Sequence, residues 1–149
     1  MTTPDLRTVI PHSGRMSLLD RIVEASEDTL TTEITVREGS LFLADGGVGA
    51  WVGLEYMAQT AAALAGHRAL REGGVVRPGV LLGARQYGCS CPRFPVGCTL
   101  RVTARIAAGS SAEVSSYDCR LAGDGIEAAA TLTIYHGDRL ETELTEERA

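Results

Sequence analysis

A long apolar segment, residues 49–66 (GAWVGLEYMAQTAAALAG), dominates the hydrophobic pattern of the chain. Its apolar residues recur at steps of three and four, which predicts an amphipathic helix. The face that this spacing defines consists of Trp51, Leu54, Ala58, Ala61, Ala62 and Ala65. Tyr56, Met57 and Leu64 carry apolar surface round the other sides, so we expect a nearly enclosed helix that ends near residues 73–74.

Segments rich in β-branched residues lie on both sides of this helix, and they predict six strands. The predicted strands are residues 18–25, 30–36, 80–89, 99–107, 112–121 and 126–135. The remaining segments are an N-terminal arm (1–10), a glycine-rich loop (37–49), a turn (92–97) and a polar C-terminal tail (138–149). We therefore expect one α+β domain over residues 1–149, an antiparallel sheet of about six strands wrapped round one long central helix.

The composition restricts the possible partners. The chain has 149 residues and a formal net charge of -5, which argues against a nucleic-acid partner or an anionic membrane surface. The longest apolar run is interrupted by Glu55, Gln59 and Thr60, so no membrane span is expected. The N-terminal sequence has no basic segment followed by an apolar one, and the cytoplasm is therefore the expected location.

The four cysteines are Cys89, Cys91, Cys98 and Cys119. In a cytosolic protein of this size they are expected to be reduced thiols rather than a disulfide framework. Paired C-x-x-C spacing, which is typical of zinc sites, is absent. We expect neither a metal nor a cofactor.

Glu55 is the one charged residue of the apolar helix. A carboxylate among apolar neighbours is costly unless it is paired, hydrogen-bonded or protonated. One interpretation is structural, because Gln59 follows one helical turn later and can bond the carboxylate. The other is functional, with Glu55 as the candidate catalytic acid near the helix N-terminus.

Three segments resemble motifs of one enzyme family, in the family's own order. Residues 10–24 (IPHSGRMSLLDRIVE) are similar to the PHR-x-P-x-LL-x-DR opening of the β-hydroxyacyl-carrier-protein dehydratases of the hotdog fold. Residues 53–66 resemble their E-A-M-A-Q helix, and residues 78–83 (PGVLLG) resemble their GFLLG strand. Residues 49–59 are most similar to the opening P-A-W-x-G-x-E-Y-M-A-Q of the divergent, ApeP-like branch found with aryl-polyene and xanthomonadin-type pigment clusters.

The resemblance implies a hotdog fold and assigns the family's catalytic carboxylate to Glu55. It implies that the Ala50 N–H polarises the thioester carbonyl. The expected substrate-binding residues are Ala50, Trp51, Tyr56 and Gln59. The family also uses a histidine in a G-H-F-P loop ahead of the helix, contributed across a dimer interface, but the corresponding residues 39–45 (GSLFLAD) contain none.

The missing histidine matters because dehydration needs a base. A proton must leave the carbon beside the thioester carbonyl, and a neutral imidazole is suited to accept it. Helix-terminal N–H groups can hold the charge on the carbonyl oxygen, and a carboxylic acid can protonate the leaving hydroxyl. His12, which is a loop residue in the family motif, is the best placed histidine of this chain; the alternative is a histidine from a hotdog partner.

The first functional hypothesis is a dehydratase of β-hydroxyacyl thioesters, carried by an acyl carrier protein or coenzyme A, in polyene or fatty-acid-type synthesis. The apolar helix surface left outside the sheet predicts a homodimer, or a heterodimer with another hotdog protein. A non-catalytic acyl-binding partner is the second hypothesis, favoured by the missing loop histidine. A hotdog thioesterase, in which Glu55 activates water, is the third.

Overall fold

The computed structural model describes residues 3–9, 17–77, 79–111 and 113–136. Its helical elements are α1 (Leu6–Val9), the 3-10 turn η2 (Ala50–Val52) and α2 (Gly53–Arg71). The strands are β1 (Arg21–Ala25), β2 (Thr29–Thr35), β3 (Leu43–Ala44), β4 (Gly47–Gly49), β5 (Val80–Cys89), β6 (Arg93–Pro95), β7 (Thr99–Ile106), β8 (Val114–Gly123) and β9 (Ile126–Tyr135). The predicted C-terminal tail, residues 138–149, lies outside the described residues.

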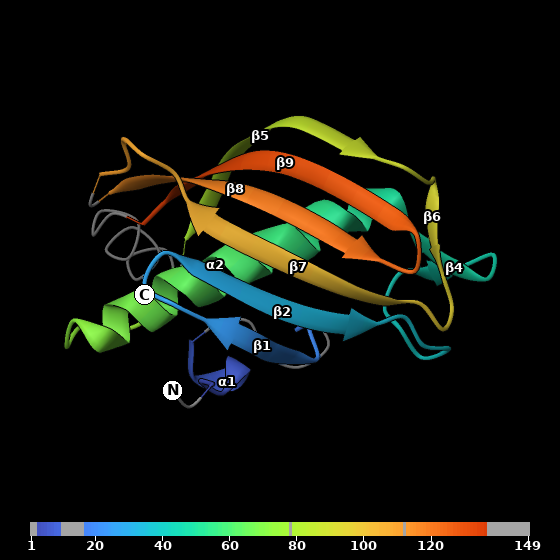
Figure 1. Ribbon diagram of the computed structural model, residues 1–149, viewed down its shortest axis with the longest axis horizontal. Coiled ribbons are helices and arrows are strands. Elements are labelled where there is room, and N and C mark those ends of the chain that lie inside the picture. The colour runs from blue at the N-terminus through green and yellow to red at the C-terminus, as the bar shows by residue number, and fades with distance from the viewer. Residues whose placement is uncertain (1–2, 10–16, 78, 112, 137–149) are drawn as a thin grey trace, which may run out of the picture.

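Six of these strands form one antiparallel sheet in the order β1-β2-β7-β8-β9-β5. They correspond to the six strands predicted from the sequence, and β5 and β9 have the predicted limits. Figure 1 shows α2 crossing beneath the curved sheet, so the sheet wraps the long helix. This is the hotdog arrangement that the resemblance implies, and the predicted fold class is confirmed.

Alternation along the strands places the core between the sheet and α2. In β7 the inward side chains Leu100, Val102 and Ala104 are completely buried, whereas Arg101 and Arg105 point outward. The strands β8 and β9 show the same period of two. This alternation is typical of an antiparallel sheet with one buried and one solvated face.

The buried side of α2 differs from the predicted one. Met57 and Leu64 are completely buried, together with the polar residues Gln59 and Thr60. Trp51, by contrast, is 65% exposed. Of the residues predicted to form the core face, only Ala61 is buried; Leu54, Ala58, Ala62 and Ala65 are half-buried. The prediction was wrong because the buried side includes Gln59 and Thr60, whose polar groups bond to Leu18 and Thr32 outside the helix.

The segment predicted as an N-terminal arm contains the short helix α1. Residues Leu6 and Val9 of the short helix α1 are buried, and α1 packs against α2. Gly66 makes this packing possible, because a Cβ at that position would lie 1.9 Å from the carbonyl oxygen of Val9. The two backbones therefore approach more closely than any other residue would allow.

A second, small sheet was also missed. The strands β3, β4 and β6 pair in that order, although the sequence predicted only a loop and a turn there. These strands have two or three residues each, too short to show a periodic pattern. Their core residues Val48 and Phe94 are completely buried, and the pairing brings the segment before β6 to the start of the long helix.

The strand β5 forms one edge of the large sheet and is exposed over most of its length. Its apolar side chains Val80, Leu81 and Leu82 are among the large exposed hydrophobic residues of the described chain. An exposed apolar edge strand presents unpaired backbone groups to any strand that can add to it.

Candidate functional site

Glu55 lies in the first turn of α2 and is half-buried. The side-chain amide of Gln59 donates to its Oε1 at 3.1 Å. Positions four residues apart lie on the same face of a helix, so the two side chains meet without distortion. The carboxylate is thus held by a hydrogen bond at the end of the helix where N–H groups point outward.

Gln59 is completely buried, and its carbonyl oxygen accepts from the Leu18 N–H at 3.0 Å. The same side chain therefore links the segment before β1 to Glu55. With both ends of its amide engaged, Gln59 is suited to orient the carboxylate. The sequence reasoning included Gln59 among substrate-binding residues and considered its bond to Glu55, but the contact with Leu18 spans 41 positions and leaves no local signal.

The start of the long helix is fixed by two backbone contacts of Ala50. Its N–H donates to the carbonyl oxygen of Pro92 at 3.0 Å, and its carbonyl oxygen accepts from the Tyr87 hydroxyl. The donor that was expected to polarise a thioester carbonyl is therefore engaged in this structure. The next N–H belongs to Trp51, in the first turn, where N–H groups lack acceptors within the helix.

Trp51 and Phe42 form an exposed aromatic pair beside this helix start. Their ring centroids are 5.3 Å apart with the rings at 67°, an edge-to-face contact. Trp51 precedes Glu55 by four residues, so both lie on the same side of the helix. Apolar surface is thus exposed at the start of the helix that carries Glu55.

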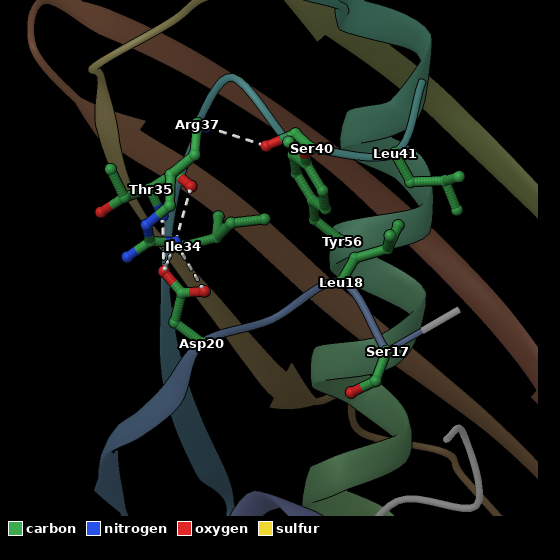
Figure 2. A pocket seen from close by; sticks show the side chains of 10 residues that line it. Ser17, Leu18, Asp20, Ile34, Thr35, Arg37, Ser40, Leu41 and Tyr56 are labelled. Carbon is green, nitrogen blue, oxygen red and sulfur yellow. Dashed lines mark hydrogen bonds and ion pairs between the residues drawn. The ribbon is translucent and has the colours of Figure 1, made fainter. Parts of the chain in front are cut away.

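Tyr56 points to another side of α2. It is 2% exposed and stacks on Phe94, with centroids 6.0 Å apart. Burial, with smaller contributions from Cys98 and Asp20, raises the pKa of its phenol to about 12. Its side chain lines a hollow of about 360 Å³ next to the segment before β1 (Figure 2).

The histidines of the described chain lie away from Glu55. His67 follows it by twelve residues on α2, which corresponds to about 18 Å along the axis. His136 follows β9, and its Nε2 lies 3.2 Å from the hydroxyl of Tyr117, at the other end of α2. His12, the predicted candidate base, lies outside the described residues. None of the described histidines is therefore placed to act with Glu55.

Within residues 3–9, 17–77, 79–111 and 113–136, no group of three or more His, Cys, Asp or Glu side chains is arranged to hold a metal ion. The four cysteines are unpaired, with Cys98 and Cys119 buried. None of the described helices has the length and hydrophobicity needed to cross a membrane.

Three solved structures illustrate the shared fold. A chain of the dehydratase heterocomplex ApeI:P from Xenorhabdus doucetiae has a TM-score of 0.86 and 20% identity, covering 97% of this chain and 98% of that chain. A hypothetical thioesterase from Streptococcus pneumoniae TIGR4 with coenzyme A has a TM-score of 0.61 and 12% identity, covering 78% and 84%. The PaaI protein of E. coli has a TM-score of 0.60 and 16% identity, covering 76% and 80%.

Comparison with known sequences identifies the family of this chain within the shared fold. None of the curated proteins matches it. A profile of ApeP-like proteins, described as the ApeP dehydratase, matches residues 4–145. Because that match spans nearly the whole sequence, the chain belongs to the ApeP-like dehydratase family.

Proposed function

We propose that this chain is one subunit of a dehydratase that removes water from β-hydroxyacyl thioesters, with Glu55 as the general acid. The observation that carries the proposal is the Gln59 bond, which holds the Glu55 carboxylate at the start of α2 while the described histidines lie elsewhere. In the described part of the chain the positioned acid has no histidine beside it, which leaves half of an elimination site to be completed. The other half comes from a second hotdog chain.

The chemistry assigns a role to each group. The base takes a proton from the carbon next to the thioester carbonyl, and the Trp51 N–H donates to the carbonyl oxygen as it gains charge. Protonated Glu55 gives its proton to the hydroxyl on the β-carbon. The carbon–oxygen bond then breaks, and water and an α,β-unsaturated thioester leave the site.

Two exposed features support a partner on the Glu55 side. The edge strand β5 presents Leu81 and Leu82 to solvent, and Trp51 is exposed beside Glu55. The similar Xenorhabdus chain comes from a dehydratase heterocomplex. We propose a heterodimer with another hotdog protein, in which the partner contributes a histidine; a homodimer would cover the same surface but would bring no histidine at residues 39–45.

The acyl group would be carried by an acyl carrier protein or by coenzyme A, in polyene or fatty-acid-type synthesis. The proposed compartment is the cytoplasm, where reduced cysteines such as the four of this chain are ordinary. No cofactor is needed for this elimination, because proton transfers alone complete it.

The test is to incubate the purified chain, alone and mixed with hotdog proteins encoded near it, with a β-hydroxyacyl thioester on a carrier protein. Mass spectrometry then measures loss of water. We expect activity only in the mixture, and its loss in Glu55→Gln, which keeps an oxygen for the Gln59 amide. Glu127→Gln is the control, because Glu127 is exposed on β9.

Two outcomes would contradict the proposal. Full activity of the chain alone that His12→Ala abolishes would make it a self-sufficient enzyme with His12 as base. Full activity of the mixture containing Glu55→Gln would make this chain a non-catalytic acyl-binding subunit.

Thioester hydrolysis is a second candidate, because the similar Streptococcus protein is described as a thioesterase and was solved with coenzyme A. In that case Glu55 would activate water for attack on the carbonyl carbon. A free acid as product, with no unsaturated thioester, would select it over dehydration.

A further inference from the structure

A hollow of about 360 Å³ lies on the side of α2 that Tyr56 faces. It is formed by the segment before β1, the end of β2, the loop that follows β2, and the helix (Figure 2). Successive helical residues point about 100° apart, so the Tyr56 side is not the Glu55 side. The dehydratase proposal makes no use of this hollow.

An ion pair fixes its polar rim. Arg37 Nη1 donates to both carboxylate oxygens of Asp20, at 3.0 and 3.1 Å. The Thr35 N–H also donates to Asp20 Oδ2 at 2.8 Å. The Asp20 oxygens are therefore occupied as acceptors, and the charge of Arg37 is balanced beside the opening.

Two hydroxyl groups of the lining, those of Tyr56 and Ser40, keep a proton that they can donate. No residue in the described part of the chain bonds the Tyr56 hydroxyl, although Tyr56 is only 2% exposed and lines the hollow. Figure 2 shows its ring rising from α2 toward Ser40. Ser40 Oγ accepts from the Arg37 N–H at 2.8 Å, so its own proton remains available. The Tyr56 hydroxyl is not among the buried unpartnered atoms of the described chain, so it opens onto the hollow and can donate to water or to a ligand there.

Three aliphatic side chains form the apolar part of the lining. Leu18, Ile34 and Leu41 lie beside the Tyr56 ring. A ligand of this hollow needs an apolar body for these side chains and an acceptor oxygen for the Tyr56 hydroxyl. It needs no net charge, because Asp20 already neutralises Arg37.

We propose that this hollow binds a small molecule with an apolar body and a neutral carbonyl oxygen, which accepts a hydrogen bond from the Tyr56 hydroxyl. The site is separate from the Glu55 surface, and its existence does not depend on dehydratase activity. Since the phenol pKa is raised to about 12, Tyr56 remains a donor throughout the physiological range. An anionic oxygen gains less here, because the Asp20 carboxylate faces the same opening.

The experiment is a titration of the full-length, ¹⁵N-labelled protein with hexanamide, followed by the shifts of backbone amide signals. Hexanoate, which has the same chain length and a charged end, is the second probe. We expect saturable shifts at Ser17, Ile34, Ser40 and Leu41 with hexanamide, and weaker binding of hexanoate. Tyr56→Phe keeps the ring and its stacking on Phe94 but removes the donor, so we expect its affinity for hexanamide to fall about five-fold.

Two further variants make the result specific. Tyr135→Phe makes the same chemical change on β9, far from the hollow, and should bind hexanamide as the unmodified chain does. Leu41→Trp fills the hollow from the loop and should abolish the shifts. Absent shifts, shifts confined to Trp51 and Glu55, equal affinity in Tyr56→Phe, or tighter binding of hexanoate would each overturn the proposal.

Discussion

Gln59 lies one helical turn beyond Glu55, and its side-chain amide donates to the Glu55 carboxylate at 3.1 Å. The same amide accepts from the Leu18 N–H, so a completely buried side chain joins the segment before β1 to the candidate acid. The position of the carboxylate is therefore determined by a contact far away in sequence. We propose that Gln59 acts through Glu55, as a positioning residue.

Replacement of Gln59 by leucine should reduce catalysis and stability together. The Leu18 N–H would lose its acceptor, which should cost about 1–3 kcal/mol of the free energy of unfolding. In the active complex we expect kcat to fall by up to about a hundred-fold with little change in KM, because Glu55 would lose its orientation rather than its contact with substrate. Urea denaturation and steady-state kinetics of the complex measure the two effects.

Met57→Leu is the matched control for Gln59→Leu. Met57 is also completely buried on α2, but it has no hydrogen bond to lose, and the change nearly conserves volume. It should lower stability by less than about 1.5 kcal/mol and leave kcat unchanged. A similar loss of kcat in both variants would mean that the enzyme responds to any disturbance of the helix.

The long helix and the six principal strands could be predicted because each is long enough to display its period. The side of α2 that meets the sheet could not. Alanines at helical spacing are compatible with burial or with exposure, whereas the buried Gln59 and Thr60 depend on partners in the segment before β1 and in β2. From the sequence alone, a polar residue of an apolar helix cannot be assigned to the buried side, because the residue that it bonds to is not known.

The candidate site was predicted in part for the same reason. Glu55 stands out as the one charge within the apolar residues 49–66. Asp20 pairs with Arg37, and the Ala50 N–H bonds to Pro92. Each contact joins two segments that are well separated in the sequence, so no local sequence pattern predicts it. The three-residue strand β6, too short to predict, is the element that brings Pro92 to the helix start.

Gly66→Ala should destabilise the protein although alanine is the better helix former. The added Cβ would lie 1.9 Å from the carbonyl oxygen of Val9, so α1 would have to move away from α2. Forcing atoms into a packed interior typically costs about 1–3 kcal/mol. That loss should exceed the gain in helix propensity of up to about 1 kcal/mol. Thermal unfolding should show a lower Tm.

Gly39→Ala is the control for this substitution, because a Cβ at Gly39 would meet nothing within 4 Å. Its Tm should be unchanged or slightly higher. A rise in Tm in both variants would show that α1 does not restrict α2 at Gly66.

The buried hydroxyls of Thr32 and Thr60 should be energetically coupled. Their Oγ1 atoms are 2.8 Å apart, and Thr60 Oγ1 also donates to the carbonyl oxygen of Tyr56 at 2.8 Å. The proton between the two threonines therefore comes from Thr32. In Thr60→Val the Thr32 hydroxyl is left without its acceptor, which should cost about 1–3 kcal/mol.

The double variant Thr32→Val/Thr60→Val removes both partners and should lose less than the sum of the two single variants. Urea denaturation of the four proteins completes the cycle. Additive losses would contradict the coupling and would indicate that each hydroxyl acts separately.

His67 should make the protein less stable as the pH falls. Its Nε2 is buried with no hydrogen-bond partner in the described part of the chain. Burial, and then the charge of Arg71, lowers the pKa of His67 below its usual value of 6.5. Burial lowers the pKa of His136 in the same way. The unfolded chain therefore takes up protons at a higher pH than the folded protein does.

Because the unfolded state binds more protons, the free energy of unfolding should fall as the pH drops through about 6.5 and toward the lower folded-state pKa. In His67→Gln the slope should be shallower, while the stability near pH 8 should match that of the unmodified chain, because Nε2 has no hydrogen bond to lose. Urea denaturation at several pH values between about 8 and 5 measures both quantities. An equal slope in the two proteins would mean that His67 protonates as readily in the folded state as in the unfolded chain.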